Sequence, residues 1–123
     1  MKPARLLAVA TSILAAALLT GAIVPHALAD KGGVVIKIAA KRYEFNPSEI
    51  KLKKGVPVTF EFSSLDRPHG FNCPELGIRS DIMPGKANRI HFVPRKSGTF
   101  EFHCDIFCGE GHDTMTGKII VSE

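Results

Sequence analysis

Four side chains of types that bind soft metal ions lie within twelve residues near the carboxy terminus. The segment reads Cys104-x3-Cys108-x3-His112-x2-Met115, and His69 follows a predicted turn farther upstream. Thiolate and thioether ligands favour copper, and imidazole suits the same metal. Structural zinc sites are built from Cys and His, and Met is rare in them. The residue types therefore predict a copper site, with His69 as the ligand from outside the segment.

This ligand set suits the transfer of single electrons. A copper ion that alternates between two oxidation states needs ligands that accept both, and surroundings that rearrange little. A short loop between two β-strands meets that need. A disulfide between Cys104 and Cys108 is the alternative in the copper-free protein. The third cysteine, Cys73, is interpreted as a small buried apolar residue.

Short alternating runs, interrupted by Gly and Pro, make up the rest of the chain after its first segment. Strands are expected over residues 34–40, 50–53, 56–62, 89–92, 99–104 and 119–121. Six to eight short strands at this spacing predict an all-β domain, a two-sheet sandwich with Greek-key connections.

The alternation also predicts which side chains point inward. One inward set is Val56, Val58, Phe60 and Phe62, and a second is Phe100, Phe102 and Cys104. The second set brings Cys104 from the core side of its strand into the loop. His91 and His103 have the opposite parity, so they are expected at the surface and not as ligands.

The amino-terminal segment has the pattern of an export signal. Two basic residues among the first five precede an uncharged apolar run over residues 6–24, and Ala27-Leu28-Ala29 is a small-x-small cleavage site. We expect residues 1–29 to be a signal peptide and residues 30–123 to be the mature domain. The alternative is an uncleaved amino-terminal anchor, which would be the domain's only membrane contact. Either interpretation predicts a periplasmic or otherwise extracytoplasmic protein.

Charge and composition narrow the possible functions. The formal net charge of +4 includes two basic residues of the first segment, and without them 14 basic residues stand against 12 acidic ones. The charges are mixed along the chain, which argues against nucleic-acid binding. No nucleophile–base pair and no cofactor-binding loop is visible. The sequence therefore predicts a monomeric electron carrier and not an enzyme on its own.

The loop resembles the CuA motif of cytochrome c oxidase subunit II and of nitrous oxide reductase. The resemblance extends upstream, where Asp66-Arg67-Pro68-His69-Gly70-Phe71 is similar to the segment that holds the first CuA histidine. The stretch Pro74-Glu75-Leu76-Gly77-Ile78-Arg79-Ser80-Asp81 and the pair Pro84-Gly85 are also similar to subunit II. The resemblance implies a cupredoxin-like fold, and as partner a redox protein such as a cytochrome or a terminal oxidase.

The same resemblance implies a role for each ligand of a two-copper centre. Cys104 and Cys108 would bridge the two ions through their sulfurs, which lets one unpaired electron spread over both metals. The remaining ligands implied are His69 and His112, one on each ion, with Met115 and the backbone carbonyl of Ile106 as weak ligands on opposite ions.

The chain also departs from the subunit II pattern. Subunit II has a glutamate where this chain has Ile106, it has a membrane hairpin of two helices, and its aromatic residues include tryptophan, which is absent here. Three other interpretations therefore stay open. One is a mononuclear cupredoxin with His69, Cys108, His112 and Met115 as ligands. The second is a chaperone or assembly factor that delivers copper to an oxidase, and the third is a subunit of an unusual oxidase.

Overall fold

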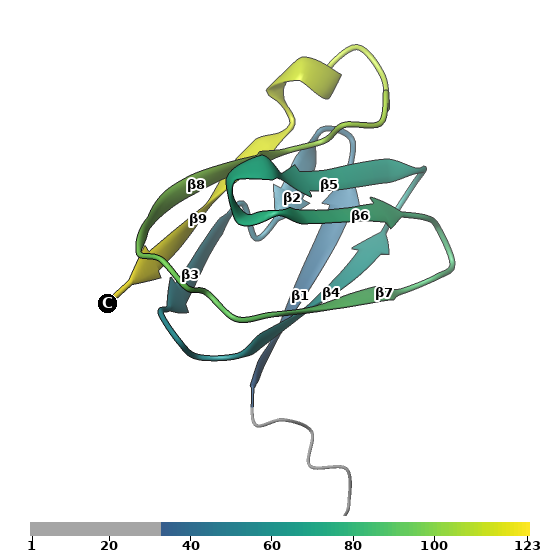
Figure 1. The fold of residues 1–123 in the computed structure, drawn as a ribbon. Helices are drawn as coiled ribbons and strands as arrows, with labels where there is room; N and C mark the ends of the chain where they lie inside the picture. The colour runs from purple at the N-terminus through teal and green to yellow at the C-terminus, as the bar shows by residue number, and fades with distance from the viewer. Residues whose placement is uncertain (1–32) are drawn as a thin grey trace, which may run out of the picture.

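The computed structural model describes residues 33–123, which form two packed β-sheets (Figure 1). One sheet has the strand order β2-β1-β4-β7 and the other β3-β9-β8-β5-β6. The strands are β1 (Val34–Lys41), β2 (Glu44–Asn46), β3 (Glu49–Lys53), β4 (Val58–Ser64), β5 (His69–Cys73), β6 (Ile78–Ile82), β7 (Asn88–Phe92), β8 (Gly98–His103) and β9 (Thr116–Ser122). Two short 3-10 helices, η1 (Pro74–Leu76) and η2 (His112–Thr114), lie in the connections.

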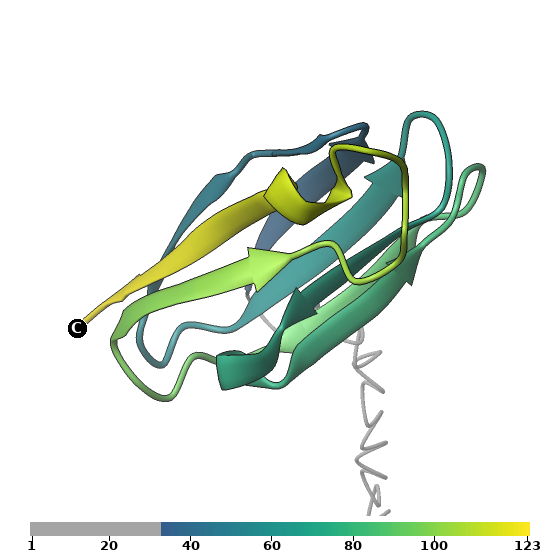
Figure 2. The same ribbon diagram turned by 90° about the horizontal axis from the view of Figure 1, so that it is seen from above.

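The chain crosses between the two layers several times, as Figure 2 shows from above. Strand β1 pairs in parallel with β4, and β3 pairs in parallel with β9. The other named pairs are antiparallel. Consecutive strands β2 and β3 lie in different sheets, and so do β6 and β7. The predicted all-β Greek-key sandwich is confirmed.

Phenylalanine rings fill the space between the sheets. Phe71 of β5 lies at the centre, with its ring centroid 4.5 Å from that of Phe102 and 4.8 Å from that of Phe62. Phe45 meets both Phe71 and Phe102 edge-on. Each of these rings is almost fully buried. Since fully burying one such side chain contributes about 1.5–3 kcal/mol, this cluster is a main source of the stability of the domain.

The predicted inward parity is correct for Val58, Phe60 and Phe62 and wrong for Val56. Val56 is 37% exposed because β4 begins only at Val58. Its N–H donates instead to the carbonyl of Lys53, in the turn that joins β3 to β4. Alternation holds only inside a strand, so the face of a side chain in the preceding turn does not follow from its parity.

Three strands, β2, β5 and β6, were not among those expected from the sequence. Strand β2 has three residues, too few for an alternating pattern. Strand β6 reads Ile78-Arg79-Ser80-Asp81-Ile82, in which the middle inward position holds a serine. Pairing along all of β5 holds β6 in the sheet. This hairpin matters for function, because its first strand begins with His69.

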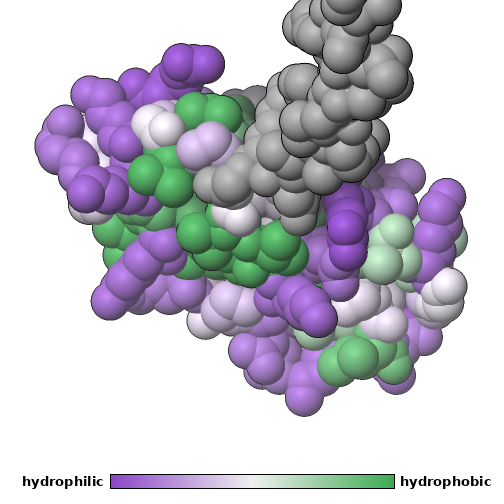
Figure 3. All heavy atoms as spheres, turned by 90° about the horizontal axis from the view of Figure 1, so that it is seen from below, coloured by the Kyte–Doolittle hydropathy of each residue, from purple (hydrophilic) through white to green (hydrophobic). Residues whose placement is uncertain are grey.

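The end of the sandwich opposite the β8–β9 loop is where the described chain begins (Figure 1). Apolar residues gather there (Figure 3), around a shallow hollow of about 240 Å³ whose lining includes Val34, Ile36 and Leu52. Within residues 33–123 no helix has the length and apolar character to cross a bilayer. The predicted signal peptide, residues 1–29, lies outside the described residues.

Candidate metal centre

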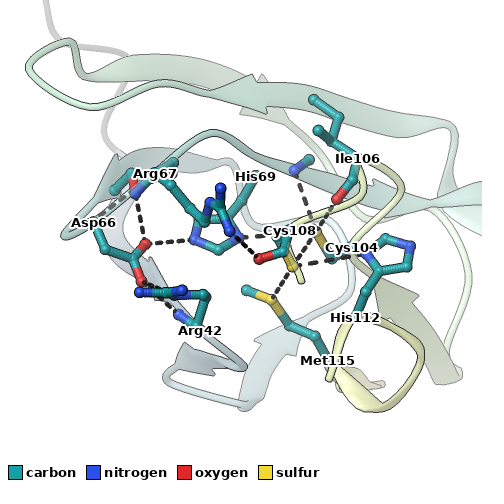
Figure 4. Close-up of polar contacts among 11 residues, drawn as sticks. Arg42, Asp66, Arg67, His69, Cys104, Ile106, Cys108, His112 and Met115 are labelled. Atoms are coloured by element: carbon teal, nitrogen blue, oxygen red, sulfur yellow. Dashed lines mark hydrogen bonds and ion pairs between the residues drawn. The ribbon is translucent and has the colours of Figure 1, made fainter. Parts of the chain in front are cut away.

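The candidate ligands come from one strand end and one loop. His69 is the first residue of β5, and Cys104 follows the last residue of β8. Cys108 lies in the loop, His112 opens η2, and Met115 directly precedes β9. The N–H of Cys104 donates to the carbonyl of Met115 at 3.0 Å, which closes the loop at its base. The strands thus bring the two ends of the segment together. The side chains of the candidate ligands gather around the two cysteine sulfurs (Figure 4).

Two cysteine sulfurs lie at the middle of the group. Cys104 Sγ and Cys108 Sγ are 3.8 Å apart, and both cysteines are free thiols. Nδ1 of His69 lies 4.0 Å from Cys104 Sγ, and the carbonyl oxygen of Ile106 lies 3.2 Å from the same sulfur. The ligand atoms of His69, Cys104 and Cys108 all lie within 4.8 Å of one another.

The second half of the site surrounds Cys108. Nδ1 of His112 and Sδ of Met115 each lie 3.7 Å from Cys108 Sγ. Each sulfur therefore has one imidazole and one weaker donor beside it. Thiolates, a thioether and imidazoles are the donors that copper prefers, so the residues present fit the metal that the sequence predicts.

The site is dry on the core side and open on one edge. His69, Cys104, Cys108 and Met115 are buried, whereas His112 is only partly so. Phe107 is 78% exposed, and its ring centroid lies 5.8 Å from that of His112. In a copper site, a shell that excludes water controls the redox potential.

Asp66 orients His69. Its Oδ1 lies 2.7 Å from Nε2 of the imidazole, which leaves Nδ1 facing Cys104 Sγ (Figure 4). A metal-binding histidine commonly has its second ring nitrogen held by a carboxylate in this way. Burial acts to raise the pKa of Asp66, but the N–H of Arg42, the His69 ring and the N–H of Arg67 outweigh it, so the pKa falls to about 2.

Main-chain and arginine donors hold the sulfur loop. The N–H of Gly70 points at Cys104 Sγ, 3.5 Å away, and Nη1 of Arg67 donates to the carbonyl of Cys108 at 2.9 Å. Burial, and after it the neighbouring Cys104 thiol, raise the pKa of Cys108 to about 11. Without metal, Cys108 is therefore protonated at neutral pH, and a metal ion must displace that proton in order to bind.

The structure agrees with the interpretation of the other candidates. Cys73 is fully buried on β5, and burial raises the pKa of its thiol. His91 is exposed, and its Nδ1 lies 2.7 Å from the hydroxyl of Thr59 on the neighbouring strand β4. Asp66 and Arg67 were not among the residues expected at the site from the sequence. Asp66 lies three residues before His69, a spacing at which a carboxylate can reach the ring. This spacing was the sequence feature that could have predicted the contact.

The comparisons with known proteins give the family. The chain matches the cupredoxin-like domain family over residues 9–121. It belongs to that family. The cupredoxin is 27% identical over 88 residues to cytochrome c oxidase subunit 2 of Thermus thermophilus, which covers 72% of this chain and 65% of the relative. It is 34% identical over 92 residues to nitrous-oxide reductase of Cupriavidus necator, which covers 72% of this chain and 14% of that enzyme.

A solved structure supports the same assignment. The cupredoxin superposes on a chain of a heme-copper terminal oxidase dimer with a TM-score of 0.67 and 28% identity, over 76% of this chain and 68% of the other. The predicted resemblance to oxidase subunit II and nitrous-oxide reductase is confirmed. The cupredoxin spans slightly less than two thirds of the oxidase subunit and a small part of the reductase.

Proposed function

We propose that this cupredoxin is an electron carrier whose loop holds a two-copper centre of the CuA type. The central position of both sulfurs carries the proposal. Cys104 Sγ and Cys108 Sγ lie side by side, and each has its own imidazole and its own weaker donor. A site for one ion has no need of this duplication. The bridging sulfurs would be those of Cys104 and Cys108, with His69 and His112 as the terminal ligands.

The residues of this chain hold the ligands and exclude water. Asp66 fixes the ring of His69, Gly70 donates to one sulfur, and Arg67 holds the backbone beside the other. Copper, when bound, supplies the chemistry, which is the gain and loss of single electrons. These contacts fix the ring of His69 and the backbone beside both sulfurs, so the ligands would rearrange little when an electron arrives, as fast electron transfer requires.

The mononuclear alternative uses His69, Cys108, His112 and Met115. It explains the cluster around Cys108, but it leaves Cys104 without a role, although the Cys104 sulfur lies 4.0 Å from Nδ1 of His69. Substitution of one cysteine separates the two interpretations. A site for one ion tolerates Cys104→Ser, whereas a site bridged by two sulfurs does not.

The experiment is copper reconstitution of the reduced protein. We expect two coppers per chain and a paramagnetic-resonance spectrum with hyperfine coupling shared equally by two copper nuclei. Cys104→Ser and Cys108→Ser should each abolish that sharing, and His69→Ala should weaken one copper more than the other. Cys73→Ala is the matched control, since it removes a buried thiol outside the site. One copper per wild-type chain, with Cys104→Ser indistinguishable from it, would refute the proposal.

We further propose that the cupredoxin works outside the cytoplasm, and that it exchanges electrons with a cytochrome or a terminal oxidase. The relatives named as oxidase subunits support the partner class. Protein isolated from its native host should begin at Asp30, as amino-terminal sequencing can show. Copper delivery is the competing role: a delivery protein should lose copper readily to an apo-acceptor, whereas a carrier should retain it through many redox cycles.

A further inference from the structure

We propose that Arg79 and Asp105 form a positioning pair that holds the Ile106 carbonyl at the copper site. This inference deepens the proposed function, on which it rests for the role of that carbonyl. Neither Arg79 nor Asp105 touches the sulfurs in the described structure. Their effect would therefore reach the site through the backbone between Cys104 and Ile106.

The two side chains form a double hydrogen bond. Nε of Arg79 lies 2.8 Å from Oδ2 of Asp105, and Nη2 lies 3.0 Å from Oδ1. Such a fork fixes the carboxylate in direction as well as in distance. The side chain of Asp105 is 22% exposed and that of Arg79 is 45% exposed, so the pair lies at the surface with its carboxylate the better covered of the two groups. The geometry is therefore of the kind for which an ion pair makes a measurable contribution.

The pair joins the ligand loop to the neighbouring hairpin. Arg79 lies on β6, while Asp105 immediately follows Cys104. Between them lies Gly70 of β5, and a Cβ atom there would collide with the Asp105 carboxylate and come within 3.2 Å of an Ile106 side-chain carbon. The missing side chain at position 70 thus lets the loop lie flat on the hairpin, where the arginine reaches it.

The fork contacts the loop between two other contacts that hold its backbone. Its base is closed by the hydrogen bond from Cys104 to Met115, and its far part is held by Arg67 at the Cys108 carbonyl. The carbonyl of Ile106 lies between these two ties, and the Asp105 side chain is the contact nearest to it in sequence. Without the fork, the carbonyl would still have its contact of 3.2 Å with Cys104 Sγ, but the loop on the Asp105 side of Ile106 would lose its link to β6.

The test compares Arg79→Met and Asp105→Asn with Asp81→Asn. Asp81 is the matched control because Nη1 of the same arginine contacts it at 2.6 Å, away from the loop. In the reduced, copper-free full chain, we expect amide exchange at residues 106–108 to rise about fivefold in the first two variants and to stay unchanged in Asp81→Asn. The double variant should be no worse than either single one. Arg79→Lys keeps the charge but loses the fork, so it should behave like Arg79→Met.

The copper-loaded protein provides a second readout. If the pair positions the carbonyl, Arg79→Met and Asp105→Asn should still bind two coppers but make their hyperfine couplings unequal. Unchanged exchange and an unchanged spectrum in both variants would overturn the inference, as would an equal effect of Asp81→Asn. A wild type that binds a single copper would instead refute the proposed two-copper function, and amide exchange in the copper-free chain would still decide whether the pair holds the loop.

Discussion

Asp66 should stabilise the copper-free domain at neutral pH, in addition to orienting His69. The folded pKa of about 2 lies below the ordinary value of 3.8. At 1.36 kcal/mol for each factor of ten, this difference corresponds to about 2.4 kcal/mol. The carboxylate is 27% exposed, so solvent screens part of the interaction. We therefore expect Asp66→Asn to lower the free energy of unfolding by about 1 kcal/mol at pH 7.

The sign of the pH dependence follows from the direction of the shift. A depressed folded pKa means that the ionised carboxylate stabilises the fold above pH 3.8, and that this contribution is lost as the pH falls toward 2. The wild type and Asp66→Asn should therefore differ most at neutral pH and converge near pH 2.

Urea denaturation of the reduced, copper-free protein at several pH values measures this difference. Asp113→Asn is the control, since it removes an exposed carboxylate from η2 instead. If the two aspartate variants are equally stable at pH 7 and lose stability with the same slope in acid, the reasoning about Asp66 is wrong.

Three further predictions concern the loop, the thiols and the core. Gly70→Ala should destabilise the domain by about 1–3 kcal/mol, because its Cβ collides with the Asp105 carboxylate, and a chelator should remove copper from it faster. Since the pKa of Cys108 is raised to about 11, copper binding at neutral pH should release the thiol proton. The apparent affinity for copper should therefore rise about tenfold per pH unit for each proton displaced. A copper affinity that does not depend on pH would contradict this. Phe102→Ala should lower the free energy of unfolding by about 3–5 kcal/mol, measured as a lower urea midpoint, and a loss below about 1 kcal/mol would show that the ring is not a central core residue.

The sequence alone predicted the type of fold, which the structure confirms, and it singled out the candidate donors. Inside a strand, side chains alternate strictly between faces, so Phe100 and Phe102 could be assigned to the core, and Cys104 to the core side at the strand's end. Four of the donors are near neighbours in one loop, so their spacing is visible without any knowledge of the fold. The same rule failed for Val56, because a turn precedes β4 and alternation does not extend into it.

Only the tertiary structure showed how the donors are held. Arg79 meets Asp105 because β6 pairs with β5 in a register that places Arg79 opposite Asn72, while the loop after β8 crosses Gly70. Arg67 reaches the Cys108 carbonyl from a turn 41 residues earlier in the chain. Such contacts follow from which strands become neighbours. A local sequence pattern gives the face on which a residue lies, but it does not say which distant segment that residue meets.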